Sequence, residues 1–479
     1  MNVDDLVWQT TWYGGVHPEV VDSLLEHGHL ELVEQAAAER GDWYCARGAV
    51  TALQEKGLFE RAWAVMKPFA KTGWLPAVAA GADVLLAGGR VEEALTLAYP
   101  TGEKPAVKAC EIYAETLVKC GRVDDAISFL EPHLREPWAL RALVAMTEDQ
   151  GRDVRVLDLV VPIADEARHH QQAQGRSHPA WDALDLQAEV LERSGRVEEA
   201  IRVLGEDVAA HRYGPLNTVV TYTWLLARHG RTEELRQAAT GDHAREAFRP
   251  LTSALIAAGR AGEAETLLRE HLATAQYPQE WMLMEFLAAQ GRFEEAIDIG
   301  LPTFEDPWES PLQGIVILLA GNGHHARALQ LLNECSAQYV AEAGDWVPSN
   351  RWWLMGELGR CREAIAEINA TPEMDTEERI CTVASLMAKD GRLDDAIALL
   401  ATHPHGNALT DRAKLLACQN RPTEALDVLP GVTAQRAEHE QRREGLRTSW
   451  GDTAASDGEG AEKRSQGAHR DGCAEDPPF

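Results

Sequence analysis

Paired histidines are the residues of this sequence that most suggest chemistry, because neighbouring imidazoles can bind a transition metal. They occur as His169-His170 and His324-His325, and His403 lies close to His405. Adjacent histidines point to different sides of a helix or loop, and neither HxxxH nor HExxH spacing occurs in the chain. We therefore interpret these histidines as solvated turn residues and predict no metal site.

A second candidate is the segment GIVILLAGNGHHA, in which Gly321, Gly323 and Ala326 match the GxGxxA fingerprint of dinucleotide-binding proteins. In that fingerprint a strand precedes the glycines, which let the backbone approach a pyrophosphate. The same glycines would equally close an apolar helix. The helical interpretation is favoured because Gly323 follows an equivalent residue, Gly291, by 32 positions. We therefore predict no cofactor.

Other catalytic motifs give no support for an enzyme. The chain has no GxSxG, phosphate-loop or protein-kinase motif, and its carboxylates recur at fixed repeat positions, as structural residues do. The eight cysteines include no CxxC pair and lie far apart, which is typical of reduced thiols in a cytoplasm. We predict no catalytic residues, no enzymatic activity and a cytoplasmic location.

The elements that carry these residues are repeated along the chain. Near-identical heptapeptides are GRVEEAL at Gly89, GRVDDAI at Gly121, GRVEEAI at Gly195, GRFEEAI at Gly291, GRCREAI at Gly359 and GRLDDAI at Gly391. Weaker copies begin at Gly28, Gly57, Gly151, Gly230, Gly259, Gly323 and Asn420, and most of the thirteen copies are about 32 residues apart. A period of this size predicts a solenoid of stacked supersecondary units.

Each unit is predicted to form two short amphipathic helices, because apolar residues recur at three- and four-residue steps on both sides of the Gly. The Gly lies where the first helix must end, a position that needs positive φ. The acidic pair that follows, such as Glu92-Glu93, lies in the first turn of the second helix, where the helix dipole favours negative charge. Five residues after the Gly, ten units have an Ala that lets helices cross closely. These are Ala62, Ala94, Ala126, Ala200, Ala264, Ala296, Ala328, Ala364, Ala396 and Ala425.

The order of Gly, acidic stretch, Ala and apolar residue resembles the second half of the tetratricopeptide repeat (TPR) motif, whose period is about 34 residues. The aromatic residue usual two positions after the Gly is replaced by Val, Leu, Cys or Thr in most units, so the chain resembles a divergent member. Heavy use of Ala, Arg, Gly and Glu suggests an actinobacterial type. The resemblance implies an all-α fold, a right-handed superhelical solenoid of about 12–13 antiparallel helix pairs.

Three regions are expected along the chain. Residues 1–16, with Trp8, Trp12 and Tyr13, are predicted to cap one end of the array, and residues 17–433 to form the solenoid. Residues 434–479 lack periodicity and are rich in Gly, Ser and charge, which predicts a disordered tail.

An insertion is expected within the solenoid. The 44-residue step between Gly151 and Gly195 carries about twelve extra residues, placed within 166–180. We interpret them as a surface loop, with a functional contact as the alternative.

Six tryptophans share a position 13–15 residues before the Gly of their repeat, at the start of the first helix. They are Trp43, Trp74, Trp138, Trp181, Trp308 and Trp346. We interpret them as side chains that pack on the preceding repeat. The alternative is an aromatic strip that binds a partner, because Trp is enriched in binding hot spots.

In the TPR family the first helices line a concave groove that receives peptides, and the residue six positions before the Gly is expected to point into it. In this sequence the position holds Asp83, Glu115, Glu189 and Glu285, with Trp224 and Trp353 in two further units. The resemblance therefore implies a partner-binding groove with four acids and two aromatics. Such a groove favours a basic or amphipathic segment, and a solvated acidic face without a ligand is the alternative.

The net charge of −30 opposes a broad nucleic-acid footprint, which needs Lys and Arg to replace phosphate counterions. We therefore expect a protein or peptide partner and no nucleic acid. The longest apolar run, near 315–320, is much shorter than a membrane-spanning helix, and the N-terminus has no basic signal-peptide region. We expect no membrane association, and the sequence leaves the oligomeric state open.

Taken together, these features predict a non-catalytic scaffold or adaptor that binds a partner segment in the concave groove of a TPR-like solenoid. The first alternative is a peptide- or ligand-sensing regulator, because similar repeats serve as sensors in such proteins. The second alternative is a helical-repeat enzyme with a pocket at the centre of the groove.

Overall fold

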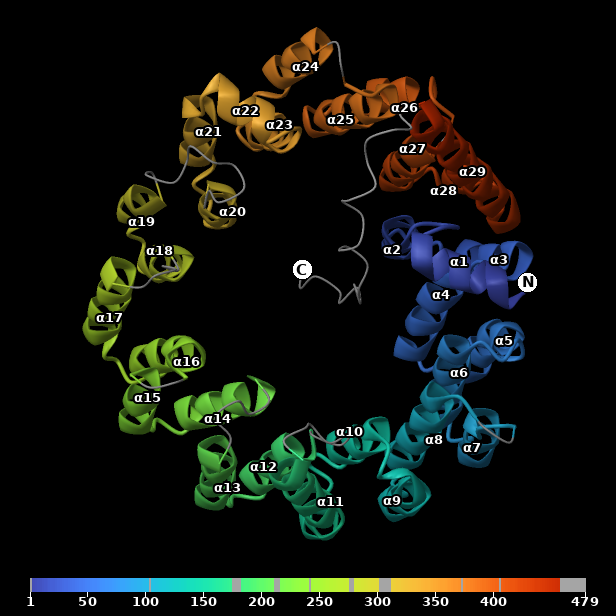
Figure 1. Ribbon diagram of the computed structural model, residues 1–479. Coiled ribbons are helices and arrows are strands. Elements are labelled where there is room, and N and C mark those ends of the chain that lie inside the picture. The colour runs from blue at the N-terminus through green and yellow to red at the C-terminus, as the bar shows by residue number, and fades with distance from the viewer. Residues whose placement is uncertain are drawn as a thin grey trace.

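The computed structural model describes residues 2–102, 105–174, 182–210, 216–240, 243–274, 280–300, 312–371, 374–404 and 406–456. Within these ranges the regular structure is all helical and contains no strand, which confirms the predicted fold class. Figure 1 shows two layers of helices that follow a circular path, so that the first and last helices lie beside each other.

Thirteen helices, one from each repeat, lie before the repeat Gly and are called the first helices. They are α2 (Pro18–Glu26), α4 (Trp43–Glu55), α6 (Leu75–Ala87), α8 (Val107–Lys119), α10 (Pro137–Met146), α12 (Ala183–Arg193), α14 (Leu216–Arg228), α16 (Ala244–Ala257), α18 (Glu280–Ala289), α20 (Leu312–Gly321), α23 (Trp346–Glu357), α25 (Thr376–Lys389) and α27 (Gly406–Cys418). In Figure 1 most of them line the inside of the ring.

Thirteen second helices follow the repeat Gly and form most of the outer layer. They are α3 (Leu30–Arg40), α5 (Phe59–Ala70), α7 (Val91–Ala98), α9 (Val123–Leu130), α11 (Asp153–Gln174), α13 (Val197–Ala210), α15 (Thr232–Ala239), α17 (Ala261–Thr274), α19 (Phe293–Gly300), α21 (His325–Glu334), α24 (Cys361–Ala370), α26 (Leu393–Leu400) and α28 (Pro422–Asp427). The remaining elements are α1 (Val3–Trp12), a 3₁₀ helix (Glu131–His133), α22 (Ala337–Glu342) and α29 (Val432–Ser456).

The turn between the two helices of a repeat has the geometry expected from its Gly. Gly89 has φ +75°, its N–H donates to Leu86 O at 2.9 Å, and the N–H of Arg90 donates to Leu85 O at 2.8 Å. These two bonds form a Schellman motif, which satisfies carbonyls at the end of α6. A Cβ at Gly89 would meet no atom within 4 Å, so backbone conformation and not crowding selects Gly here. Asn420 takes the same left-handed conformation in the last repeat, with φ +56°.

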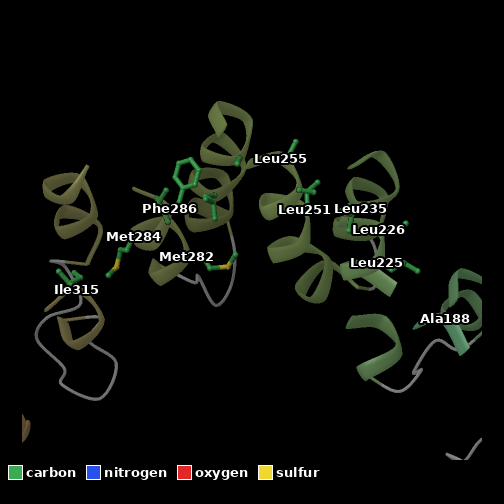
Figure 2. Close-up of a cluster of buried hydrophobic side chains, with 14 of the residues drawn as sticks. Ala188, Leu225, Leu226, Leu235, Leu251, Leu255, Met282, Met284, Phe286 and Ile315 are labelled. Atoms are coloured by element: carbon green, nitrogen blue, oxygen red, sulfur yellow. The ribbon is translucent and has the colours of Figure 1, made fainter. Parts of the chain in front are cut away.

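The core runs between the two layers and continues from repeat to repeat. All ten of the predicted close-packing alanines are buried, and none exceeds 2% exposure. Figure 2 shows part of the largest cluster, with Leu225 of α14, Leu251 of α16, Phe286 of α18 and Ile315 of α20 in successive repeats. Each buried Leu or Ile contributes roughly 1.5–3 kcal/mol relative to an exposed side chain, so each repeat depends on its neighbours for stability.

Arginine side chains tie successive second helices together on the surface. Arg292, directly after the repeat Gly, pairs with Glu295 at 2.6 Å in its own helix and with Glu265 of the preceding repeat at 2.7 Å. Arg231 likewise pairs with Glu234 and with Glu198, each at 2.6 Å. The acidic residues therefore lie in the first turn of the second helix, as predicted, and also pair with the Arg of the repeat motif.

The array closes on itself, which we did not predict. We call the contact between residues 2–40 and residues 406–443 the seam. At the seam α2 packs against α27 and α1 packs against α29. One hydrophobic cluster contains Leu6, Val20 and Leu24 from the start of the chain and Leu416 and Leu429 from its end. The first repeat thus stacks on the last one, and the ends of the solenoid cover each other's apolar faces.

Polar contacts at the seam join residues about 400 positions apart. Gly15 N–H donates to Gln435 Oε1 at 2.9 Å, and Gln435 Nε2 donates to Gly15 O at 3.2 Å. Arg40 donates to the carbonyl oxygens of Leu426 and Leu429 at 2.9 and 2.6 Å. These bonds satisfy backbone groups at the last turn of the array.

Each terminal segment contains a helix. The predicted cap, residues 1–16, contains α1, which packs on α29. The predicted tail begins as helix α29, because residues such as Gln435 and Arg436 find partners in the N-terminal segment. Residues 457–479 lie outside the described part of the chain.

The insertion predicted within 166–180 is partly helical. Helix α11 has 22 residues and extends to Gln174, so the extra residues lengthen a second helix before the chain leaves it. Residues 175–181 lie outside the described ranges. None of the described helices is both long and apolar enough to cross a bilayer.

Candidate functional site: the inner face and the seam cavity

All six predicted groove residues belong to first helices. Asp83 lies on α6, Glu115 on α8, Glu189 on α12, Trp224 on α14, Glu285 on α18 and Trp353 on α23. These helices line the interior of the ring in Figure 1. Among the interactions of the described residues none joins two of the six, so they are separate positions along the inner layer.

Two of the four acids lie near Lys119. The Asp83 carboxylate accepts a hydrogen bond from Lys119 Nζ at 2.6 Å and is about half exposed. Glu115 is half-buried and lies one helical turn before Lys119 on α8. A basic ligand would have to compete with Lys119 at these two positions, which therefore supply less free negative charge than the sequence implied.

The other two acids are exposed. Desolvation by the surrounding helices raises the pKa of Glu189, with Glu148 and Glu192 adding to the effect and the cations Arg193 and Arg228 opposing it. Glu285 is exposed on α18, one turn after the exposed Trp281, whose ring faces the guanidinium of Arg249 at 5.2 Å. These acids are available to a partner that reaches the inner layer.

The two aromatics differ in exposure. Trp353 is 46% exposed and lies 6.1 Å from the ring of His325. Trp224 is half-buried in α14. An exposed Trp of this kind offers a large, rigid contact surface at low entropic cost, and Trp353 is therefore the better candidate.

The tryptophans at the start of the first helices pack inside the array where the structure describes them. Trp43 and Trp74 are buried, and their rings meet edge to face at 4.8 Å. Trp138 and Trp346 pack partly buried against the largest core cluster. The packing interpretation therefore holds for these four, while Trp181 and Trp308 lie outside the described ranges.

The described glycines and histidines that could suggest a cofactor or metal site lie in helix ends and turns or pack on neighbouring side chains. Gly321 ends α20, an apolar helix and not a strand, and Gly323 forms the left-handed turn that follows it with φ +80°. His324 packs on Phe293 with a ring distance of 4.2 Å, and His169 Nδ1 bonds to Asp165 O. His405 lies outside the described part of the chain. Within that part, no three His, Cys, Asp or Glu side chains form a group that could hold a metal ion.

A cavity of about 850 Å³ opens at the seam. Its walls come from both ends of the chain: the end of α1 with the following loop, the first turns of α25, the inner side of α27, and α29. We call it the seam cavity. Its volume is within the range of sites that hold small ligands or short peptide segments.

Acidic side chains dominate one wall of the seam cavity. The lining includes the carboxylates of Asp375, Glu377, Glu378, Asp411 and Glu438, against the cations Lys414 and Arg442. Five acids against two bases leave three negative charges when the lining histidines are neutral. Desolvation raises the pKa of the Cys381 thiol in this wall to about 12, with Asp411 adding to the effect, so the thiol is protonated and is no thiolate nucleophile.

Aromatic side chains line the cavity from the end of α1 and the loop that follows it, which we call the aromatic wall. Trp12 is 49% and Tyr13 is 59% exposed, and the ring of Trp12 lies 4.6 Å from that of His439. The guanidinium of Arg443 lies over the Trp12 ring at 5.4 Å. The sequence pointed to Trp12 and Tyr13 only as cap residues. No local pattern could place them beside α25 and α27, because the seam brings together segments from opposite ends of the chain.

Comparisons with known proteins concern the fold. No protein-family model and no curated protein matches the chain. The structure titled Naa15/Naa10 bound to HypK-THB matches 81% of this chain and 69% of that chain, with a TM-score of 0.36 and 15% identity. The pentatricopeptide repeat protein PPR10 from maize matches 90% of this chain and 70% of that chain, with a TM-score of 0.32 and 16% identity. The APC/C hetero-tetramer Cut9-Hcn1 matches 87% of this chain and 92% of that chain, with a TM-score of 0.23 and 12% identity.

The chain is a helical repeat solenoid. Its two-helix units, left-handed turns and continuous core establish this. Identities and scores of this size do not identify the ligand of this chain.

One prediction is corrected by the comparisons. PPR10 was also solved in complex with an 18-nt psaJ RNA element, in a structure that matches 88% of this chain and 62% of that chain at 14% identity and a TM-score of 0.33. Helical repeat solenoids include an RNA-binding protein, so the prediction that nucleic acid is excluded was wrong. The reason is that net charge describes the whole surface, whereas a ligand meets the local charge of one face.

Proposed function

We propose that this protein is a non-catalytic scaffold that binds a segment of another protein along the inner face of its ring. The observation that carries the proposal is the continuous inner layer of first helices, on which Glu189, Glu285 and Trp353 are exposed. Carboxylates and an exposed indole can bind cationic and apolar side chains of an extended or helical segment. The seven cysteines of the described ranges are all unpaired, which fits the cytoplasmic location that we propose.

The rigidity of the inner layer supports a binding role. Its helices are anchored by buried residues on the side of the second helices, so exposed residues keep their positions relative to one another. A rigid surface loses little conformational entropy on binding, and more of the contact energy then appears as affinity.

A variant with altered inner positions tests the proposal. The triple substitution Glu189→Gln, Glu285→Gln and Trp353→Ala should lower the recovery of bound partners about 10-fold or more in affinity capture from a native lysate. The matched control changes three exposed outer-layer residues, Asp158→Asn, Asp298→Asn and Val154→Ala, and should retain partners as the unaltered chain does.

The nature of the captured molecules decides between two classes of partner. Protein identified by mass spectrometry that is lost only in the inner-layer variant supports the proposal. RNA that is recovered in place of protein, or equal recovery by both variants, contradicts it.

The seam cavity favours a second candidate function, a ligand-responsive regulator. Because its walls come from both ends of the chain, a molecule bound there contacts the two segments whose association closes the ring. Any ligand that prefers the closed ring stabilises it by mass action.

A further inference from the structure

We propose that the seam cavity binds a guanidinium group carried by a peptide, and that the bound group strengthens the closure of the ring. The site is separate from the inner-face positions, so the inference stands or fails independently of the proposed scaffold function. It depends on free negative charge on one wall, on aromatic faces on the other, and on the fact that the walls belong to opposite ends of the chain.

The free negative charge lies on α25 and α27. Several lining carboxylates are already engaged: Asp375 accepts the N–H groups of Glu377 and Glu378 at 2.8 and 3.2 Å, and Glu438 pairs with Arg442 at 2.7 Å. The Glu378 carboxylate is exposed, and no ion pair of the described residues includes it.

Asp411 adds a second carboxylate with spare capacity. Its nearest cation is Lys414 at 3.8 Å, and Lys414 makes its shorter contact with Glu19 at 2.8 Å. A cationic ligand therefore finds the Glu378 carboxylate without an ion pair and the Asp411 carboxylate in only a long contact with Lys414.

The aromatic wall selects a flat cation. Guanidinium groups stack on indole and phenol rings while their edges donate hydrogen bonds to carboxylates, which an ammonium cannot do in one geometry. Arg443 already lies over the Trp12 ring, so this ring accepts a guanidinium within the chain itself. Tyr13, with 59% exposure, offers a further ring that no cation of the described residues covers.

The position of the cavity links ligand binding to ring closure. Tyr13 precedes α2, whereas Glu378 and Asp411 lie on α25 and α27 of the last two repeats. A guanidinium that contacts both walls forms bonds only when the seam is closed, and its binding therefore shifts the equilibrium toward the ring.

Calorimetric titration of the full-length protein tests the chemistry. The probes are two end-blocked tripeptides, acetyl-glycyl-arginyl-glycine amide and its glutamine counterpart, which differ only in the cationic side chain. The arginine peptide should bind at least about 10-fold more tightly than the glutamine peptide, and its affinity should fall as salt is raised. Equal affinity of the two peptides, or no binding of either, overturns the proposal.

Matched variants test the location. Glu378→Gln and Tyr13→Leu should each weaken arginine-peptide binding about 10-fold, since the first removes a carboxylate charge at nearly constant volume and the second replaces an aromatic ring by a smaller aliphatic group. Glu285→Gln, an exposed acid of the inner layer, should leave the affinity unchanged. The proposal is wrong if Glu285→Gln weakens binding as much as Glu378→Gln does, because the peptide would then recognise the general acidity of the protein.

Hydrogen exchange tests the coupling to closure. The arginine peptide should slow amide exchange in both α1 and the first turns of α29, which contain neither Glu378 nor Asp411. Slower exchange restricted to α25 and α27 would show that the peptide binds one wall without strengthening the seam.

Discussion

Regular repeat junctions and the seam bury the same kinds of apolar side chains but differ in their polar contacts. Within the array, Arg292 joins Glu265 and Glu295 on the surface, and equivalent ion pairs recur from repeat to repeat. The seam also has ion pairs, such as Lys414 with Glu19 at 2.8 Å and Arg436 with Asp5 at 3.1 Å. In addition, Gln435 and Arg40 bond there to backbone groups of the opposite end of the chain. Directional bonds to backbone atoms fix position more closely than exposed ion pairs do, because screening and side-chain entropy weaken the latter.

This difference in polar contacts follows from how far apart in sequence the contacting segments are. Neighbouring repeats meet because they are adjacent in sequence, and apolar stacking is sufficient to set their register. The two ends meet only after the intervening repeats have formed. The seam therefore needs contacts that identify one particular partner, such as the pair between Gly15 and Gln435.

The largest loss of stability is expected when a side chain in the core of the array is shortened. Leu143 is fully buried in α10 within the largest cluster, and Leu143→Ala should lower the free energy of unfolding by about 2–5 kcal/mol because it leaves a cavity. Urea unfolding followed by far-ultraviolet circular dichroism measures the change. A loss below about 1 kcal/mol would mean that the junction relaxes around the cavity and is less rigid than the seam comparison assumes.

An intermediate effect is expected at the seam. Gln435→Ala removes the hydrogen bonds with Gly15 and Pro430, which contribute about 1 kcal/mol each. The variant should populate open rings, seen as a larger radius of gyration in small-angle X-ray scattering, with little loss of helicity.

Arg292→Ala is the matched change within the array. It should leave the radius of gyration unchanged and shift the unfolding midpoint slightly, and only at low salt. Identical scattering of the two variants would remove the distinction between junction and seam.

The smallest effect is a pH response of opposite sign in the two regions. In the array, burial raises the pKa of Asp185 to about 6, so its contribution to stability is present below the ordinary value of 3.8 and is lost as pH rises through about 6. At the seam, burial lowers the pKa of His17 from 6.5, with Lys414 adding to the effect and Glu19, Asp411 and Asp22 opposing it. Its contribution is present above pH 6.5 and is lost as pH falls below that value.

Two variants separate these responses. Asp185→Asn should raise the unfolding midpoint relative to the unaltered chain at pH 7 and do so less at pH 5. Because protonation of His17 weakens the seam, the radius of gyration of the unaltered chain should increase between pH 7 and pH 5, and His17→Gln should reduce this increase. The same pH slope in both variants and the unaltered chain would show that neither group is responsible.

The sequence was sufficient to predict the repeats but not their closure. Turn glycines such as Gly89, the buried alanines and the helical period act within one repeat or between neighbours, so local pattern determines them. The seam depends on Leu6, Gln435 and other residues whose partners lie at the far end of the chain. The small rotation between successive repeats adds up over thirteen units, and no residue pattern shows whether the total rotation brings the last repeat back to the first one.

The candidate site was predicted in the same uneven way. The family position placed Glu189, Glu285 and Trp353 on inner helices as exposed residues, but it did not anticipate that Lys119 pairs with Asp83. The seam cavity could not be predicted, because Tyr13 and Glu378 line one cavity only after closure.

A ring of repeats also has no loose end from which to come apart. In an open array the terminal units fray first, since each has one neighbour, and proteases or exchange with solvent enter there. Here α2 packs on α4 on one side and on α27 on the other. Unfolding of the first repeat must therefore break contacts with two neighbours, as it does for a repeat in the middle of the chain. The terminal repeats should then be as resistant to local unfolding as the central ones.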